Sequence, residues 1–216
     1  MKKRFRKTKI IVSVIVFLLV VLGLGFVYLN IEYPLAYNSI IKKYAKEYDV
    51  DPYLIASIIN VESSYNKEAV SPKDAKGLMQ VTPQTGQWAS EEINMEGYTE
   101  ESLFDPDTNI RIGTWYLNRL KDQFDENLDN VLIAYNAGSG NLNKWLVNKE
   151  YSKDGVNVDN IPFEETEKYL VKVKQSYKVY SKVYKKNFDQ LGQDSAYIDL
   201  GNNVKKTMKE LYQVIQ

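Results

Sequence analysis

The sequence contains no histidine and no cysteine among its 216 residues. Without histidine, a Ser-His-Asp triad, a histidine general base and histidine metal ligands are excluded. Without cysteine, thiol nucleophiles, thiolate zinc sites and disulfide bonds are excluded as well. If the protein is an enzyme, its proton chemistry therefore falls mainly to Asp, Glu, Lys or Tyr.

The chain also lacks a net charge, because 28 Lys and Arg residues balance 28 Asp and Glu residues. The charges are segregated, since six basic residues precede the first acidic residue, Glu32. Removing these six leaves 22 basic against 28 acidic residues, so the rest of the chain carries a net charge of −6. A mildly acidic domain without a basic stripe is a poor candidate for binding nucleic acid. We expect no nucleic-acid partner.

Residues 10–29 contain no charged side chain and are nearly all Ile, Val, Leu or Phe. As a helix, twenty residues span roughly 30 Å, the thickness of the bilayer hydrocarbon core. The basic residues before them are expected to stay on the cytoplasmic side, which places the rest of the chain outside. The sequence therefore predicts a cytoplasmic basic segment at 1–9 and a single-pass anchor in the cytoplasmic membrane at 10–29.

A cleaved signal peptide, which would release a secreted protein, is the alternative for this segment. The apolar run is longer than a usual signal core, and residues 28–33 lack the small-x-small pattern of a cleavage site. A buried core helix fits this length and apolarity poorly. An uncleaved anchor is the favoured interpretation.

The remaining chain shows helical periodicity and helix-start signals. A capping residue followed by proline opens a predicted helix at Asp51-Pro52 and precedes another, from about Thr108, at Asp105-Pro106; a short helix is expected to start near Thr82-Pro83. These helices are expected to end near residues 64, 91 and 124, and others are predicted at 37–48, 130–137, 164–185 and 203–215. Loops are expected at 65–77 and 148–160. No segment alternates as strands do, so the predicted fold class is mainly α.

Glu62 occupies an unexpected place in the helix that begins at Pro52. At 100° per residue it falls within the apolar arc, whereas Ser57, Asn60 and Ser63 fall on the opposite side, which is expected to be solvated. Burial and the negative end of the helix dipole both disfavour an ionised carboxyl. A raised pKa is therefore predicted, as suits a general acid. A glutamate at the rim, paired with Lys or Arg, is the alternative.

Four motifs follow in order from this glutamate. They are Glu62-Ser63-Ser64-Tyr65-Asn66, Gly77-Leu78-Met79-Gln80, Ala134-Tyr135-Asn136-Ala137-Gly138, and Glu165-Thr166 with Tyr169. In this order and spacing the chain resembles the catalytic domain of soluble-type lytic transglycosylases (the SLT domain), which belongs to the lysozyme-like superfamily. The resemblance implies a lysozyme-like catalytic domain at 42–186, preceded by a linker and the start of the first helix at 30–41 and followed by a helical tail at 187–216.

The resemblance also implies the roles of individual residues. Glu62 matches the single catalytic glutamate. The residues that match substrate-binding positions are Ser71, Gly77, Leu78, Met79, Gln80, Tyr135, Asn136 and Tyr169. Ser71 would position the N-acetyl group of the sugar or the catalytic carboxyl, and the Tyr169 hydroxyl would approach that carboxyl. The chain departs from the family pattern after Thr166, where an arginine often follows.

The implied activity is that of a carbon–oxygen lyase acting on peptidoglycan glycan strands. Glu62 would act as acid and then as base, cleaving the β-1,4 bond between N-acetylmuramic acid and N-acetylglucosamine and leaving 1,6-anhydro ends. No metal and no cofactor would be required. Two alternatives remain open. One is a hydrolytic muramidase of the same fold, whose second carboxylate would be Glu68, Asp74, Asp105 or Asp107. The other is a non-catalytic wall-binding or scaffold component of an envelope complex.

Several aromatic residues have more than one interpretation. Tyr169 could belong to a packing stripe with Tyr177, Tyr180 and Tyr184. The three tryptophans, Trp88, Trp115 and Trp145, could be core residues or platforms for sugars. An active enzyme recruited by a larger assembly, with the tail at 187–216 contacting an envelope partner, is a further hypothesis.

Overall fold

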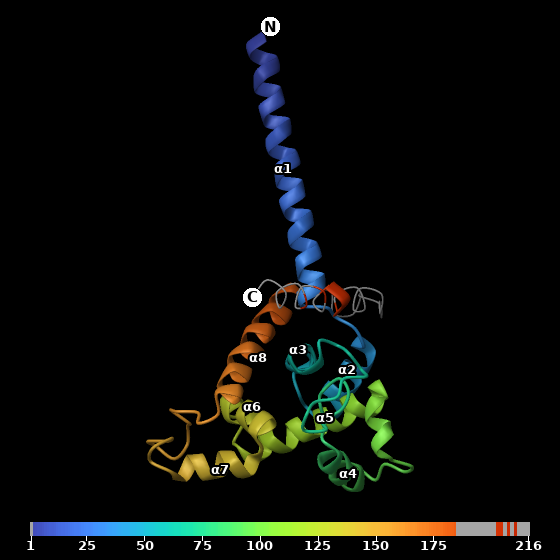
Figure 1. Ribbon diagram of the computed structural model, residues 1–216, viewed down its shortest axis with the longest axis vertical. Helices are drawn as coiled ribbons and strands as arrows, with labels where there is room; N and C mark the ends of the chain where they lie inside the picture. The colour runs from blue at the N-terminus through green and yellow to red at the C-terminus, as the bar shows by residue number, and fades with distance from the viewer. Residues whose placement is uncertain (1, 185–201, 205–206, 208–209, 211–216) are drawn as a thin grey trace. The chain divides into compact units, whose positions relative to one another are not determined.

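The computed structural model describes residues 2–184, 202–204, 207 and 210. The chain divides into two compact units, one comprising Met1–Pro34 with Ser195–Gln216 and the other Leu35–Asp194. Helix α1 belongs to the first unit and the remaining labelled helices to the second (Figure 1). The helix predicted at 203–215 lies largely outside the described residues, as does most of the predicted tail.

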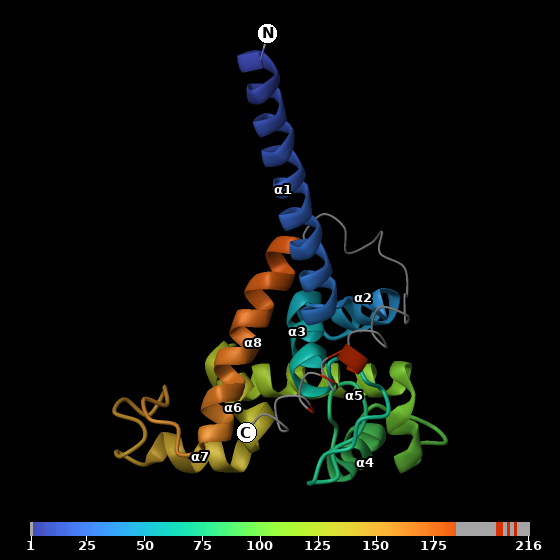
Figure 2. The same cartoon turned by 45° about the horizontal axis from the view of Figure 1, so that its top comes forward.

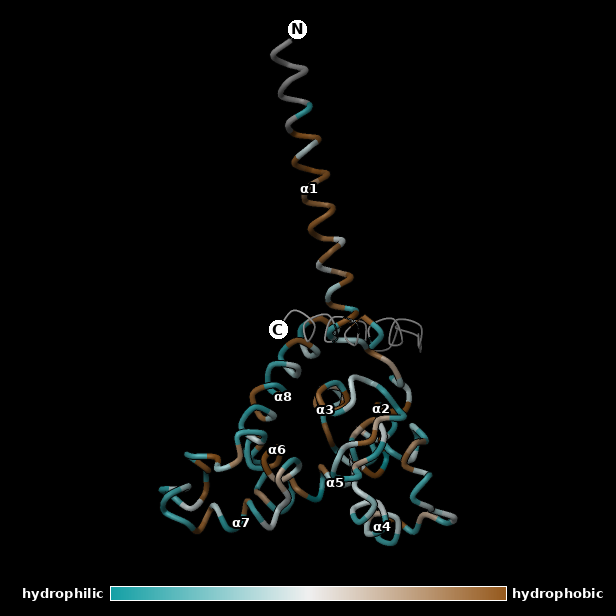
Figure 3. Tube along the Cα trace, viewed as in Figure 1, coloured by the Kyte–Doolittle hydropathy of each residue, from teal (hydrophilic) through white to brown (hydrophobic). Residues whose placement is uncertain are grey.

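Helix α1 runs without a break from Lys2 to Glu32. Its segment Ile11–Glu32 has a mean hydropathy of 2.9, and none of its most apolar window is buried. Figure 3 shows most of this segment in the brown of hydrophobic residues. The helix is therefore long and apolar enough to cross a membrane. It begins earlier than the predicted span of 10–29, because the Lys and Arg residues before that span are themselves good helix formers.

The second unit is built from helices. They are α2 (Asn38–Glu47), α3 (Pro52–Ser63), α4 (Pro83–Glu92), the 3₁₀ helix η1 (Glu100–Phe104), α5 (Pro106–Gln123), α6 (Leu128–Ala137), α7 (Ser139–Val147) and α8 (Glu164–Val183). In the part of the chain that the structure describes, extended pairing is limited to isolated bridges from Lys76 to Val70 and Val81. The predicted mainly α fold is confirmed.

Three helix starts share the capping chemistry that was predicted for two of them, at Asp51 and Asp105. The side chains of Asp51, Thr82 and Asp105 accept hydrogen bonds from backbone N–H groups in the first turns of α3, α4 and α5, and proline stands at the first position of each helix. These side chains satisfy N–H groups that have no partner within the helix. The starts of these elements are thus local properties of the sequence.

Helix α7 was not predicted, because Gly138-Ser139-Gly140 looks like the end of a helical region. Gly138 does end α6, and its N–H donates to the Ala134 carbonyl at 2.8 Å. Its φ of 87° then redirects the chain, and α7 starts at the next residue. Gly138 therefore both ends α6 and precedes the first residue of α7, since it adopts a conformation that other residues rarely take.

Helix α3 lies at the centre of the unit, packed against α8 and α2 (Figures 1 and 2). The predicted solvated face at Ser57, Asn60 and Ser63 is wrong, because Ser57 and Asn60 are buried. Helices pack on both sides of α3, and the polar groups bond inside the fold instead. Ser57 donates to the Tyr53 carbonyl at 2.5 Å, and the Asn60 amide donates to Ser176 Oγ of α8 at 3.4 Å.

Helix α5 is the second packing centre, in contact with α2, α4, α6 and η1. It also supports the loop before α4. A Cβ atom on Gly113 would lie 2.6 Å from the sulfur of Met79, so glycine at this position allows the loop to approach the helix closely. Through this contact, α5 supports the segment that carries Met79.

Candidate active site

Glu62 lies in the last turn of α3, next to a sharp change in chain direction. The helix is closed by Ser64, whose N–H donates to the Asn60 carbonyl at 3.0 Å. Ser64 and Tyr65 have positive φ angles of 50° and 63°, and the Tyr65 side chain is buried. The turn therefore ends the helix directly after Glu62 and directs the chain into the loop that approaches α5.

The surroundings of Glu62 favour its protonated form. Although the residue keeps partial solvent access, desolvation raises its pKa from about 4.5 to about 7, and the negative charge of Glu165 adds to the rise. The Tyr169 hydroxyl acts in the opposite direction. The predicted rise in pKa is confirmed, with burial as its main cause. Near neutral pH both protonation states are populated, as a group that gives and takes a proton requires.

Two tyrosines bring hydroxyl groups near this carboxyl. Burial and the charge of Glu62 raise the pKa of Tyr135, on α6, and of Tyr169, on α8, well above 10. Both hydroxyls are therefore protonated. Tyr135 donates to the Met79 carbonyl at 2.8 Å. The buried Tyr169 hydroxyl forms no hydrogen bond of ordinary geometry within the described residues, yet it is close enough to stabilise the ionised Glu62.

The segment Gly77-Leu78-Met79-Gln80 is held by one buried amide. Asn109 Nδ2 donates to the carbonyls of Lys76 at 2.9 Å and Leu103 at 2.7 Å, while its Oδ1 accepts from Met79 N at 2.8 Å. Gly77 has a φ of 74°, and a Cβ there would lie 2.2 Å from the Leu103 carbonyl. Glycine is thus required by both backbone conformation and space.

The side chains of this segment differ in what they can contact. Leu78 and Met79 are fully buried, so they can meet a ligand only through their backbone. Their carbonyls already accept hydrogen bonds from the hydroxyls of Ser63 and Tyr135. Gln80 is partly exposed, and its amide donates to two carbonyls of the adjoining loop. Of the four residues, Gln80 alone lines a pocket that the structure reveals next to α6.

Ser71 organises the tip of the same loop. Its hydroxyl accepts hydrogen bonds from the N–H groups of Lys73 at 3.2 Å and Ala75 at 3.0 Å. The turn presents Lys73, whose ammonium group lies 3.3 Å from a carboxylate oxygen of Glu165 at the start of α8. A role of Ser71 toward the sugar or toward Glu62 stays a prediction.

A pocket of about 350 Å³, here called the inner pocket, brings several predicted residues together. Gln80, Tyr135 and Asn136 line it, with Asn136 held by the Thr166 hydroxyl at 2.8 Å. The other lining residues are Lys73, Val81, Thr82, Thr85, Tyr116, Ala137, Gly138, Asn141, Phe163, Glu165 and Thr166. Glu62 and Tyr169 are coupled to its wall through Tyr135 and Glu165.

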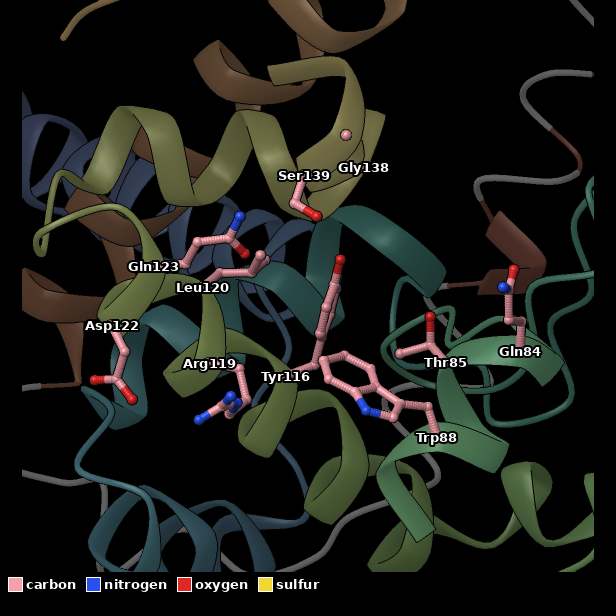
Figure 4. Close-up of a pocket in the computed structure, with 11 residues that line it drawn as sticks. Gln84, Thr85, Trp88, Tyr116, Arg119, Leu120, Asp122, Gln123, Gly138 and Ser139 are labelled. Atoms are coloured by element: carbon pink, nitrogen blue, oxygen red, sulfur yellow. The ribbon is translucent and has the colours of Figure 1, made fainter. Parts of the chain in front are cut away.

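A second pocket of about 800 Å³ is here called the distal pocket (Figure 4). Its lining residues are Gln84, Thr85, Trp88, Tyr116, Arg119, Leu120, Asp122, Gln123, Gly138, Ser139 and Gly140. Thr85, Tyr116 and Gly138 belong to both pockets, so the two adjoin, and together they are here called the groove. Periodicity and motifs did not single out the distal pocket.

Aromatic rings follow the groove from one pocket to the other. Trp88 contacts Tyr116 at a centroid distance of 6.2 Å, and Tyr116 contacts Tyr135 at 5.6 Å. Trp88 is 40% exposed, whereas Trp115 and Trp145 are buried, which separates the three tryptophans into one groove residue and two core residues. Apolar ring surface beside hydroxyl and amide groups suits a ligand that has both characters. The described residues contain no group of three or more acidic side chains placed to hold a metal ion.

Comparison with known proteins decides the family. Residues 39–157 match the family described as the transglycosylase SLT domain. The chain belongs to this family. The chain is 38% identical over 148 residues to the soluble lytic murein transglycosylase of Escherichia coli K12, covering 68% of this chain and 23% of that protein. It is 34% identical over 170 residues to the membrane-bound lytic murein transglycosylase C of Shigella sonnei, covering 67% and 46%.

Solved structures agree with this family assignment. The 70 kDa soluble lytic transglycosylase of Escherichia coli superposes with a TM-score of 0.62 at 33% identity, over 71% of this chain and 25% of that chain. An inactive glutamate-to-glutamine mutant of the Pseudomonas aeruginosa lytic transglycosylase Slt superposes with a TM-score of 0.64 at 28% identity, over 73% and 26%. The chain spans about a quarter of the length of the soluble relatives that it matches.

Proposed function

We propose that this SLT domain is a peptidoglycan lytic transglycosylase. It cleaves the β-1,4 bond between N-acetylmuramic acid and N-acetylglucosamine and leaves a 1,6-anhydro end. The observation that carries the proposal is the Glu62 carboxyl, whose pKa is about 7 and whose charge acts on two tyrosines, one of them in the wall of a groove. The names of its relatives, which are lytic murein transglycosylases, support the same reaction.

In the proposed reaction Glu62 gives away one proton and then takes up another. The protonated carboxyl gives its proton to the glycosidic oxygen as the bond to C1 breaks. The ionised carboxylate then takes the proton of the sugar's own C6 hydroxyl, and that oxygen closes on C1. The attack is intramolecular, so it benefits from a high effective concentration. Desolvation favours the acid before the first step, and the Tyr169 hydroxyl stabilises the carboxylate after it.

The polar residues of the inner pocket are assigned to the sugar. Tyr135 and Asn136 hold the N-acetyl group of the muramic residue against the reacting centre, and Gln80 borders the same space. Hydrogen bonds with Met79 and Thr166 fix the orientations of Tyr135 and Asn136 before a ligand enters. Such preorganisation lowers the free energy needed to order the site on binding.

Hydrolysis is a second candidate, and one observation favours it. Glu165 lines the inner pocket, and its charge acts on Glu62. It could therefore serve as the second carboxylate that a hydrolase uses to activate water. The four carboxylates considered from the sequence have other partners: Asp105 caps α5, and Asp107, Asp74 and Glu68 form ion pairs with lysines. The ion pair between Glu165 and Lys73 opposes a role as base.

The lytic transglycosylase reaction and hydrolysis are distinguished by the muramic ends that they leave. Full-length protein in detergent is incubated with purified peptidoglycan, and the muramic ends are analysed by mass spectrometry with and without borohydride reduction. Anhydro ends support the proposal, whereas reducing ends alone would establish a hydrolase. Glu62→Gln is expected to abolish cleavage in both cases. Glu165→Gln abolishes cleavage only by the hydrolase, and Glu164→Gln, at an exposed neighbour paired with Lys168, is the matched control.

We also propose that α1 anchors the SLT domain to the cytoplasmic membrane, with residues 1–9 inside and the domain outside. The apolar span Ile11–Glu32 and the membrane-bound relative support this topology. Because the chain has no cysteine, single cysteines can be introduced and labelled with a membrane-impermeant maleimide. Asn143→Cys should be labelled in intact cells and Lys3→Cys only after permeabilisation. The reverse pattern would contradict the topology, and loss of the Lys3→Cys label from the mature protein would indicate signal cleavage.

A scaffold without activity is tested by a zymogram on cell-wall material. Clearing by the wild-type protein and none by Glu62→Gln support the enzyme. Binding without clearing by the wild-type protein would favour a wall-binding component instead. A partner in an envelope complex stays a prediction.

A further inference from the structure

The distal pocket contains two opposite charges that do not neutralise each other. Arg119 and Asp122 both line it, and its other lining residues are uncharged. They lie three residues apart on α5, a spacing at which opposite charges commonly pair on a helix. In the part of the chain that the structure describes, neither forms an ion pair or a side-chain hydrogen bond. Figure 4 shows both side chains among the residues that line the pocket.

Arg119 differs in this respect from many other cations of the domain. Several basic side chains have ionic partners, namely Lys43, Lys67, Lys73, Lys76, Arg111, Lys121, Lys168 and Lys174. Arg119 instead borders a groove whose aromatic rings, Trp88 and Tyr116, lead to the inner pocket. A guanidinium group that has no internal partner and lies beside a binding groove is suited to a carboxylate of the ligand.

The chemistry of the substrate then identifies the ligand group, provided that the proposed function holds. The sugar backbone of peptidoglycan carries hydroxyl and N-acetyl groups, which are uncharged. Its ionic groups lie on the peptide stem, which is attached through the lactyl group of muramic acid and carries carboxylates and, where it contains a diamino acid, an amine. We propose that the distal pocket is a subsite for the peptide stem, in which Arg119 binds a stem carboxylate and Asp122 binds a stem amine.

The pairing of charges favours a stem over other anions. Asp122 repels a ligand that carries only negative charge, such as a phosphate-rich polymer, whereas a ligand with both signs gains from both residues. Single exposed ion pairs contribute little, but a guanidinium that binds a carboxylate through two hydrogen bonds contributes more. We therefore expect an effect of about tenfold from Arg119 and a smaller one from Asp122.

A denuded strand offers one competing carboxylate, that of the lactyl group. Three substrates distinguish a stem carboxylate from the lactyl carboxylate as the group that Arg119 binds. They are strands with intact stems, the same strands with the stem amine acetylated, and strands whose stems have been removed by an amidase. Each is tested with full-length wild-type protein, Arg119→Gln and Asp122→Asn. Lys172→Gln, which removes an exposed charge of α8 that lines neither pocket, is the control.

The wild-type protein is expected to show a higher kcat/KM on intact than on denuded strands. Arg119→Gln should lower this ratio about tenfold, mainly through KM, because the distal pocket does not contain Glu62. Asp122→Asn should lower the preference for the free amine over the acetylated one about threefold, and Lys172→Gln should change neither ratio. Equal losses on intact and denuded strands in Arg119→Gln, or a wild-type preference for denuded strands, would overturn the stem assignment.

Failure of the proposed reaction would look different. If the wild-type protein cleaves none of the three substrates, their affinities are compared by co-sedimentation with the same variants. A preference for intact strands that is lost in Arg119→Gln supports the stem subsite without any catalysis. Equal affinity of the wild-type protein for intact and denuded strands rejects it.

Discussion

Replacing Glu62 by glutamine is expected to stabilise the folded domain at alkaline pH although it removes the proposed activity. In the folded protein the pKa of Glu62 is about 7, against about 4.5 for an exposed glutamate. Below pH 4.5 the carboxyl is protonated in both states and no penalty arises. As the pH rises from 4.5 to 7, the unfolded chain ionises first and the folded domain loses stability relative to it. Above pH 7 the loss is complete and constant.

The size of this effect follows from the raised pKa. At about 1.4 kcal/mol per pKa unit, a rise from 4.5 to about 7 corresponds to roughly 3 kcal/mol. Glutamine has nearly the same shape and never ionises, so Glu62→Gln lacks this penalty. For a domain of this size, 1 kcal/mol changes Tm by about 2–4 °C. The variant should therefore melt roughly 6–12 °C above the wild type at pH 8 and close to it at pH 4.

Tryptophan fluorescence measures this difference in the full-length protein. All three tryptophans, Trp88, Trp115 and Trp145, lie in the SLT domain, so the signal reports on the domain and not on α1. Urea unfolding at pH 4 and pH 8 gives the two free energies of unfolding. Glu68→Gln, which removes an exposed carboxylate nearby, controls for the loss of one charge. An equal stability difference at both pH values, or none at pH 8, would refute the reasoning.

Three further substitutions test the site. Tyr169→Phe removes the hydroxyl that lowers the Glu62 pKa, so the loss of activity at alkaline pH should move to higher pH in a pH–rate profile. Glu165→Gln removes a charge that raises this pKa, and the same limb should move to lower pH; shifts in the same direction would contradict the assigned causes. Asn109→Ala removes three buried hydrogen bonds and should lower the free energy of unfolding by roughly 3 kcal/mol in urea, whereas the exposed Asn143→Ala should leave it nearly unchanged.

Local signals in the sequence predicted much of the fold. The starts of α3, α4 and α5 follow from a capping side chain and a proline, whose effects act within one helical turn. The solvated face assigned to α3 was wrong, because periodicity cannot show how many neighbours surround a helix. Ser57 is compatible with a buried helix because it bonds to a carbonyl of its own helix, whereas the partner of Asn60 is supplied by tertiary packing against α8.

The candidate site was predictable where motifs mark it. Glu62, Tyr135 and Tyr169 are coupled electrostatically although more than 100 residues separate the first from the last. The distal pocket was not predictable, because its residues come from α4, α5 and the junction of α6 and α7 without a common motif. The junction itself was missed, since a glycine that ends one helix gives no local sign that another begins.

Helix α5 sets the spacing of the whole groove. Its first turn carries Asn109, which holds the segment Gly77-Leu78-Met79-Gln80. Its middle carries Tyr116, which both pockets share, and its last turns carry Arg119 and Asp122. From Asn109 to Asp122 the helix rises about 20 Å. An inserted residue in its middle would turn the far half by about 100° and carry the charged pair out of the groove. The length of α5 therefore sets the distance between the parts of the groove. We expect α5 to tolerate substitutions far better than insertions or deletions.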